Sequence, residues 1–104
     1  MASINKFEIT NYSIIKVLDD SYISTTEEFE IPSWASIDGA GVFIIAENVS
    51  WPADVDSGKI IVTLSRERLN GFGYGRWPFE IRAIFPNGHT STLIRGDLRI
   101  TPFA

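Results

Sequence analysis

Residues 77–85 constrain the fold more than any other part of the chain, because their side chains alternate in character. Every second residue is apolar, and the positions between them are mostly polar. This period of two predicts a β-strand with one face in a core and the other in solvent. Asn87-Gly88 then supplies two residues that tolerate positive φ, as a tight hairpin turn demands. Residues 92–101 predict the returning strand, with a bend or bulge at Arg95-Gly96-Asp97.

Other segments of strand character precede this hairpin. They are residues 7–10, 13–18, 22–26, 27–31, 42–46 and 59–64. Residues 42–46 are continuously apolar, which is typical of a strand covered on both faces, in a sandwich core or at an oligomer contact. Ser65 can cap one helical turn that ends at Asn70-Gly71. Short strands with turns between them, and almost no helical periodicity, predict an all-β sandwich or small barrel.

The composition limits the classes of protein to which this chain can belong. Its 104 residues correspond to one domain, and a hydrophobic content of 44% is enough for a core. The absence of cysteine excludes disulfide bonds and thiolate metal sites. A formal net charge of −4 disfavours electrostatic binding to nucleic acid. We expect neither a signal peptide in residues 1–6 nor a membrane span, since no segment is long and apolar enough.

The basic residues are unevenly distributed along the sequence. Six of the nine are arginines in the second half of the chain: Arg66, Arg68, Arg76, Arg82, Arg95 and Arg99. One interpretation is that they are solvated charges that keep strand edges soluble, which is the commoner case. The other is that they form an interface with an acidic partner.

No set of residues in the sequence has the pattern of a catalytic or metal site. His89 is the only histidine and follows the hairpin glycine, without the orienting carboxylate and nucleophile that a general base needs. The acids Asp38, Glu47, Asp54 and Asp56 lack the spacing of an EF-hand, so we interpret them as solvated. We therefore expect no enzyme activity, no metal and no cofactor.

Aromatic residues offer a different kind of site. Trp51 lies in the long polar connection 47–58, where it either plugs the open end of a sandwich or is an exposed anchor for a ligand. Phe72 and Tyr74 lie next to glycines and are the aromatics most expected at the surface. Together with Trp77 they could form a platform for sugar rings. A carbohydrate-binding module is therefore one hypothesis.

A resemblance to a known family rests on two parts of the chain. The first is Ile37-Asp38-Gly39-Ala40 leading into Val42-Phe43-Ile44. The second is the carboxy-terminal pattern of a short helical turn, Trp77, Phe79-Glu80-Ile81-Arg82, Asn87-Gly88, Leu93-Ile94-Arg95-Gly96 and Leu98-Arg99-Ile100-Thr101-Pro102. Residues 27–102 thus resemble the small immunoglobulin-like modules of tailed-bacteriophage virion proteins, including the amino-terminal domain of baseplate upper proteins.

The resemblance implies an immunoglobulin-like antiparallel β-sandwich of six or seven strands with one short helical turn. The sandwich would span residues 27–104, and residues 1–26, which depart from the pattern, would be an amino-terminal arm or an added strand. It also implies a virion structural protein of a baseplate, tail fibre attachment or capsid surface, assembled in the host cytoplasm. Its partners would be copies of itself or other virion proteins, with no nucleic acid or membrane, and a glycan under the alternative hypothesis. The candidate contact residues are Val42, Phe43, Ile44, Trp51, Phe72, Tyr74 and Ile84.

Overall fold

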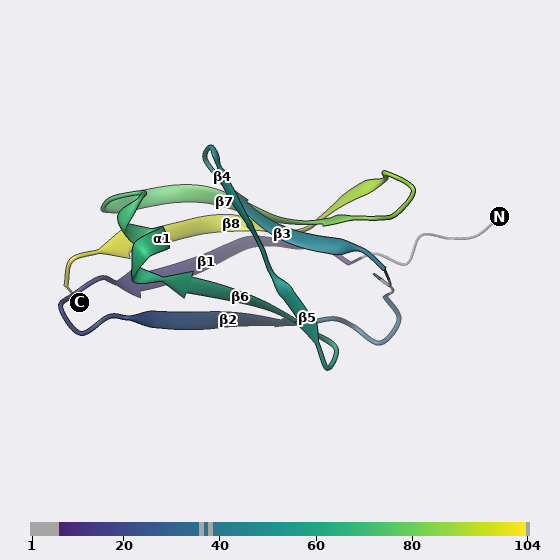
Figure 1. Cartoon of the computed structure of the whole chain (residues 1–104), viewed down its shortest axis with the longest axis horizontal. Helices are drawn as coiled ribbons and strands as arrows, with labels where there is room; N and C mark the ends of the chain where they lie inside the picture. The colour runs from purple at the N-terminus through teal and green to yellow at the C-terminus, as the bar shows by residue number, and fades with distance from the viewer. Residues whose placement is uncertain (1–6, 36, 38, 104) are drawn as a thin grey trace.

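A computed structural model of the chain describes residues 7–35, 37 and 39–103. Eight strands form two facing sheets, and one short helix connects the smaller sheet to the larger one (Figure 1). The elements are β1 (Ile9–Val17), β2 (Ser24–Glu30), β3 (Gly41–Ala46), β4 (Val49–Pro52), β5 (Asp54–Asp56), β6 (Lys59–Ser65), α1 (Arg66–Asn70), β7 (Gly75–Ile84) and β8 (Thr90–Thr101). The larger sheet has the order β1-β8-β7-β3-β4 and the smaller one β2-β6-β5. The all-β sandwich with one short helical turn is confirmed, with eight strands in the described residues.

The strand order is that of an immunoglobulin-like fold. The second, sixth and fifth strands of the chain form one sheet, as strands B, E and D do in immunoglobulin domains. The strands β8, β7, β3 and β4 follow one another in the other sheet, in the order of G, F, C and C′. The helix α1 connects β6 to β7 between the two sheets (Figure 1). The order of the strands in both sheets is therefore that of an immunoglobulin-like sandwich.

The prediction of a wholly antiparallel sandwich is wrong at one edge, because β1 pairs in parallel with β8. The strand lies beside the carboxy-terminal strand of the larger sheet, and the chain then crosses to the smaller sheet to form β2. Ile14 of β1 is 1% exposed and lies in the core. The boundary predicted at residue 26 falls inside β2, so the described part of the predicted arm belongs to the sandwich.

The core forms where the inward positions of both sheets meet. Alternation in β7 buries Phe79, Ile81 and Ala83, as the sequence predicted. Ile60 and Val62 of β6, in the facing smaller sheet, are fully buried. Each phenylalanine, isoleucine or valine side chain of this layer contributes about 1.5–3 kcal/mol on transfer from water, so its burial favours folding.

Gly96 occupies a site where two backbones approach closely. A Cβ atom there would lie 2.6 Å from the carbonyl carbon of Tyr12 and closer still to its oxygen. The irregularity predicted at Arg95-Gly96-Asp97 is not in β8 at that point, which stays paired with β7. It lies in β1, where the register shifts between Ile9 and Tyr12 and Asn11 has a φ of 59°. The glycine therefore accommodates a bulge in the neighbouring strand.

The hairpin between β7 and β8 has a different turn from the one predicted. Phe85 N donates to His89 O at 2.8 Å, and Gly88 N donates to Phe85 O at 2.8 Å. Gly88 has a φ of 88°, whereas Asn87 is not among the residues with positive φ. This is a turn closed by a single left-handed glycine, a common arrangement for hairpin loops longer than two residues. Asn87 contributes through its side chain instead, since its Oδ1 accepts from His89 N at 2.9 Å.

The short helix and the corner after it fix the start of β7. Ser65 caps α1 as predicted, because its Oγ accepts from Arg68 N at 3.2 Å. After the helix, Trp77 Nε1 donates to Gly73 O at 3.2 Å. Immunoglobulin domains have a tyrosine at this corner that likewise bonds back to the backbone upstream. No helix among the described residues has the length and apolarity to cross a membrane.

Candidate interaction surface

The outer face of the larger sheet gathers most of the arginines that the sequence placed in its second half. Since Phe79, Ile81 and Ala83 point inward, their neighbours in β7 point outward. We call this surface the arginine face, and define it by Arg76, Glu80 and Arg82 of β7 and Arg95, Asp97 and Arg99 of β8. Four arginines against two acids give the arginine face a formal charge of +2, although the whole chain carries −4.

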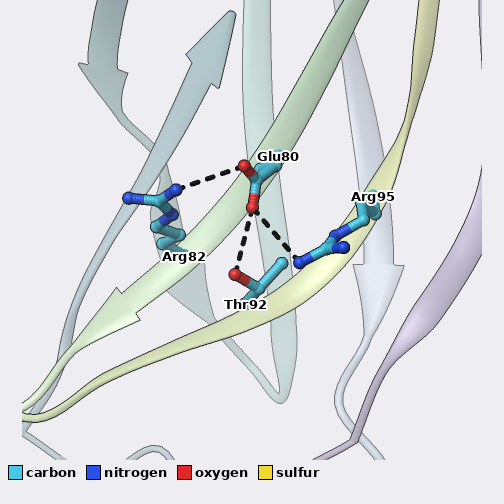
Figure 2. Close-up of polar contacts among 4 residues, drawn as sticks. All are labelled: Glu80, Arg82, Thr92 and Arg95. Atoms are coloured by element: carbon cyan, nitrogen blue, oxygen red, sulfur yellow. Dashed lines mark hydrogen bonds and ion pairs between the residues drawn. The ribbon is translucent and has the colours of Figure 1, made fainter.

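Glu80 is the centre of the arginine face (Figure 2). Its Oε2 lies 3.2 Å from Arg82 Nη2, and its Oε1 accepts from Thr92 Oγ1 at 3.1 Å. Arg95 Nη2 is 3.7 Å from the same Oε1. Partial burial alone would raise the pKa of Glu80, but the hydrogen bonds from Arg82 and Thr92 and the two positive charges outweigh it and hold the pKa below its ordinary value. Glu80 is therefore a charged anchor that orients two arginines.

The substitution Glu80→Gln tests this anchor. Because its pKa is lowered in the folded protein, Glu80 stabilises the fold above its ordinary pKa of 4.5, and this stabilisation is lost as the pH falls through the folded value. We expect Glu80→Gln to lower the free energy of unfolding by about 1 kcal/mol at pH 7. The difference from the unmodified protein should shrink as the pH falls below about 4.5, measured by urea denaturation across pH. A difference that stays constant with pH would contradict the role of Glu80.

A second carboxylate organises the other end of the arginine face. Asp97 Oδ2 lies 3.0 Å from Arg76 Nε, and Asp97 Oδ1 accepts from Ser13 Oγ of β1 at 2.8 Å. Arg76 is also directly opposite Arg99 in the register of β7 and β8. Like charges at directly opposed positions are destabilising. Asp97 pairs with Arg76, whereas Arg99 forms no ion pair among the described residues.

Two open hollows lie on this face of the sheet. One has a volume of about 460 Å³ and is lined by Ile45, Glu47, Pro78, Phe79, Glu80, Arg95 and Gly96. The other has a volume of about 550 Å³ and is lined by Thr10, Asn11, Ser13, Arg76, Arg95, Gly96, Asp97 and Arg99. Arg95 and Gly96 belong to both, so the hollows adjoin along β8. The arginine face is therefore not flat, and side chains of a partner can enter the two hollows.

Apolar side chains border the arginine face on β3 and at the end of β7. Phe43 and Ile45 are half-buried and are paired across the sheet with Arg82 and Glu80. Ile84 is 41% exposed, as predicted for an outward residue of this strand. A charged centre with apolar neighbours matches the mixed composition of protein interfaces, in which arginine and aromatic residues are enriched.

The outer face of the smaller sheet has the opposite charge. Phe29 points into the core, so Glu28 and Glu30 point outward from β2. Asp54 and Asp56 of β5 share this surface, which we call the acidic face. Lys59 completes it and lies 3.2 Å from Glu28 Oε1, which leaves a formal charge of −3 on these five residues. This face was not predicted from the sequence, because β5 lies within residues 47–58, which were expected to form a loop.

Several predicted contact residues are not available at the surface. Val42 and Ile44 are 3% and 0% exposed, because β3 turns them into the core. Trp51 is 4% exposed. The prediction that these three residues contact a partner or ligand is wrong for this chain, since the sandwich itself buries them. Phe43, Phe72, Tyr74 and Ile84 remain accessible to different degrees.

The aromatic residues form an internal cluster in place of the exposed sugar platform. The ring centroids of Trp51 and Phe72 are 6.3 Å apart, and those of Phe72 and Trp77 are 6.0 Å apart. Trp51 Nε1 donates to Thr63 O in the opposite sheet at 3.1 Å. The guanidinium of Arg68 covers the Trp51 ring at 5.0 Å from its centroid. Trp51 therefore plugs one end of the sandwich.

Tyr74 is separate from this cluster, since it is 60% exposed on the approach to β7. The four aromatics of the predicted platform therefore do not share one open surface.

Residues considered for metal binding or catalysis are scattered. In residues 7–35, 37 and 39–103 no group of three or more histidine, aspartate or glutamate side chains is placed to hold a metal ion. Asp38 lies outside the described residues. His89 is exposed at the hairpin, with its ring 6.1 Å from that of Phe85.

Comparison with known proteins gives no match, since no family model matches the chain and neither a curated protein nor a solved structure is significantly similar to it.

Proposed function

We propose that this protein is a non-enzymatic assembly module, and that it is a structural component of a tailed-phage virion, in the baseplate, the tail fibre attachment or the capsid surface. The arginine face carries the proposal. Three of its four arginines are paired with Glu80 or Asp97, beside open hollows and apolar neighbours. Such a preorganised surface is suited to binding another protein with little loss of side-chain entropy.

The assignment to a virion rests on the resemblance of residues 27–102 to the small immunoglobulin-like modules of phage particles. The immunoglobulin-like strand order of the chain is compatible with it. A shared fold alone does not define a function, so the particle itself must be tested. We expect mass spectrometry of purified phage particles from a host that expresses the gene to detect the chain at a fixed ratio to the major structural proteins. Its absence from intact particles would refute the virion role.

Light scattering on the purified protein over a range of concentrations tests assembly directly. We expect the mass to rise above that of the monomer as the concentration increases. A monomer that also binds glycans, in a glycan array read by tryptophan fluorescence, would instead favour a carbohydrate-binding module. Among the predicted platform residues, Tyr74 is the most exposed and would be the first to replace in that case.

A further inference from the structure

The two outer faces of this sandwich have opposite charges, and this opposition indicates how copies of the chain contact one another. The arginine face carries a formal charge of +2 and the acidic face −3. They belong to different sheets and point away from each other on opposite sides of the molecule (Figure 1). One molecule therefore presents both halves of a complementary pair, yet it cannot bring them together by itself.

The arginine face needs additional negative charge. Arg76 and Arg99 are opposed across the β7–β8 ladder, and Asp97 is the carboxylate paired with Arg76. The hollow around them is lined by the hydroxyl-bearing side chains of Thr10 and Ser13. Carboxylates entering this hollow would relieve the repulsion between the two guanidinium groups, and arginine binds carboxylates with well-defined geometry.

The acidic face supplies carboxylates in a matching arrangement. Glu28 and Glu30 are two residues apart on β2, as are Asp54 and Asp56 on β5. Alternate residues of a strand are spaced by about 6.6 Å on one face, and the charged residues of β7 and β8 repeat in the same way. Glu30, Asp54 and Asp56 are exposed and form no ion pair within the part of the chain that the structure describes.

We propose that the acidic face of one copy binds the arginine face of the next copy, in a head-to-tail stack of sandwiches. This proposal rests on the proposed assembly function and names the surfaces that carry it. The contact is heterologous, because two different faces meet, so every added copy exposes a new free face of each kind. The product is an open filament or, if the rotation closes, a ring. The contact depends on ionic strength, since surface charges beyond a Debye length are screened.

Charge-reversal variants test the stack by light scattering at an ionic strength of about 0.01 M, where the Debye length is about 30 Å. We expect the unmodified protein to associate there and to return to a monomer at about 1 M, where the Debye length is about 3 Å. The double variant Arg76→Glu with Arg99→Glu changes the arginine face from +2 to −2 and should remain monomeric. Glu30→Lys with Asp54→Lys changes the acidic face from −3 to +1 and should also remain monomeric. A mixture of the two variants should associate again, because each then meets a face of opposite charge.

Controls separate this contact from general charge effects. Asp20→Lys with Glu67→Lys changes the net charge by the same amount as the acidic-face variant, but at exposed sites outside both faces, and should associate like the unmodified protein. The neutral variant Arg76→Gln with Arg99→Gln is measured beside the reversed variant, in case the reversed one misfolds. The folding of each variant is first checked by thermal unfolding. Association that persists in both reversed variants would overturn the stack while leaving assembly through other contacts intact. A monomer under all conditions would overturn self-stacking, and the virion role would still be decided by the particle analysis.

Discussion

Replacing Gly96 with alanine is expected to destabilise the protein by about 3 kcal/mol, at the upper end of the range for an overfilled site. A Cβ atom at this position would overlap the backbone of Tyr12, at 2.6 Å from its carbonyl carbon and 2.8 Å from its nitrogen. Backbone atoms of a paired strand cannot move aside as the tip of a long side chain can. The added methyl group therefore separates β1 from β8 or distorts the bulge. Urea denaturation measures the loss as a lower midpoint.

Gly71→Ala is the matched control for this prediction. Gly71 follows α1 with a φ of −65°, which any residue adopts, and the nearest atom to its added Cβ would be Arg68 O at 3.3 Å. We expect a change within about 0.5 kcal/mol, since alanine also reduces the entropy of the unfolded chain. If the Gly96 and Gly71 variants were equally stable, the close approach of β1 and β8 would be wrong.

Replacing Trp51 with alanine is expected to cost about 3–5 kcal/mol, as is typical for removing a buried aromatic side chain. The substitution empties the end of the sandwich between the two sheets, where Trp51 packs against Phe72. It also removes the hydrogen bond to Thr63 O and leaves the ring site under Arg68 vacant. Thermal unfolding should show a large decrease in midpoint, together with loss of the buried tryptophan fluorescence.

Two further variants separate packing from ligand binding at the aromatic residues. Trp51→Phe keeps an aromatic ring but loses the indole donor, and should cost less than the alanine variant. Tyr74→Ala removes a side chain that is 60% exposed and should change stability by no more than about 0.5 kcal/mol. If Trp51→Ala were as stable as Tyr74→Ala, the internal plug would be refuted and an exposed platform would have to be reconsidered.

The strands that the sequence revealed are those that bury one face. Alternation located β7, and runs of apolar residues located β3 and β6, because burial in the core requires apolar side chains at the inward positions. The strands β4 and β5 were missed within residues 47–58. All three residues of β5 are exposed, so backbone pairing with β6 holds the strand and its side chains show no burial pattern.

The arginine face could be predicted only in part, because the sequence does not show which residues of β7 and β8 lie opposite one another. Alternation in residues 77–85 placed Glu80 and Arg82 on the outward side, but it did not show which residues of the next strand lie beside them. Glu80 lies opposite Arg95 because the ladder passes from the pair Ile81 and Ile94 to the pair Arg82 and Thr92, skipping one residue of β8. Such a shift within a strand is not marked in the sequence by a glycine or proline. The structure is needed to define the register of β7 and β8, because a shift of one residue changes every cross-strand pair, including the partners of the arginines.

The parallel pairing of β1 with β8 affects how the chain folds during its synthesis. The paired residues Ile9 and Ile94 are 85 positions apart, so β1 leaves the ribosome well before its partner exists. At typical rates of translation this delay is about 4–17 s. Throughout that time Tyr12 and Ile14 have no sheet edge to join, and loops this long also slow the final closure. Ser13 between these two residues and Lys16 after them are polar, and they help to keep the unpaired segment soluble until the last strand emerges.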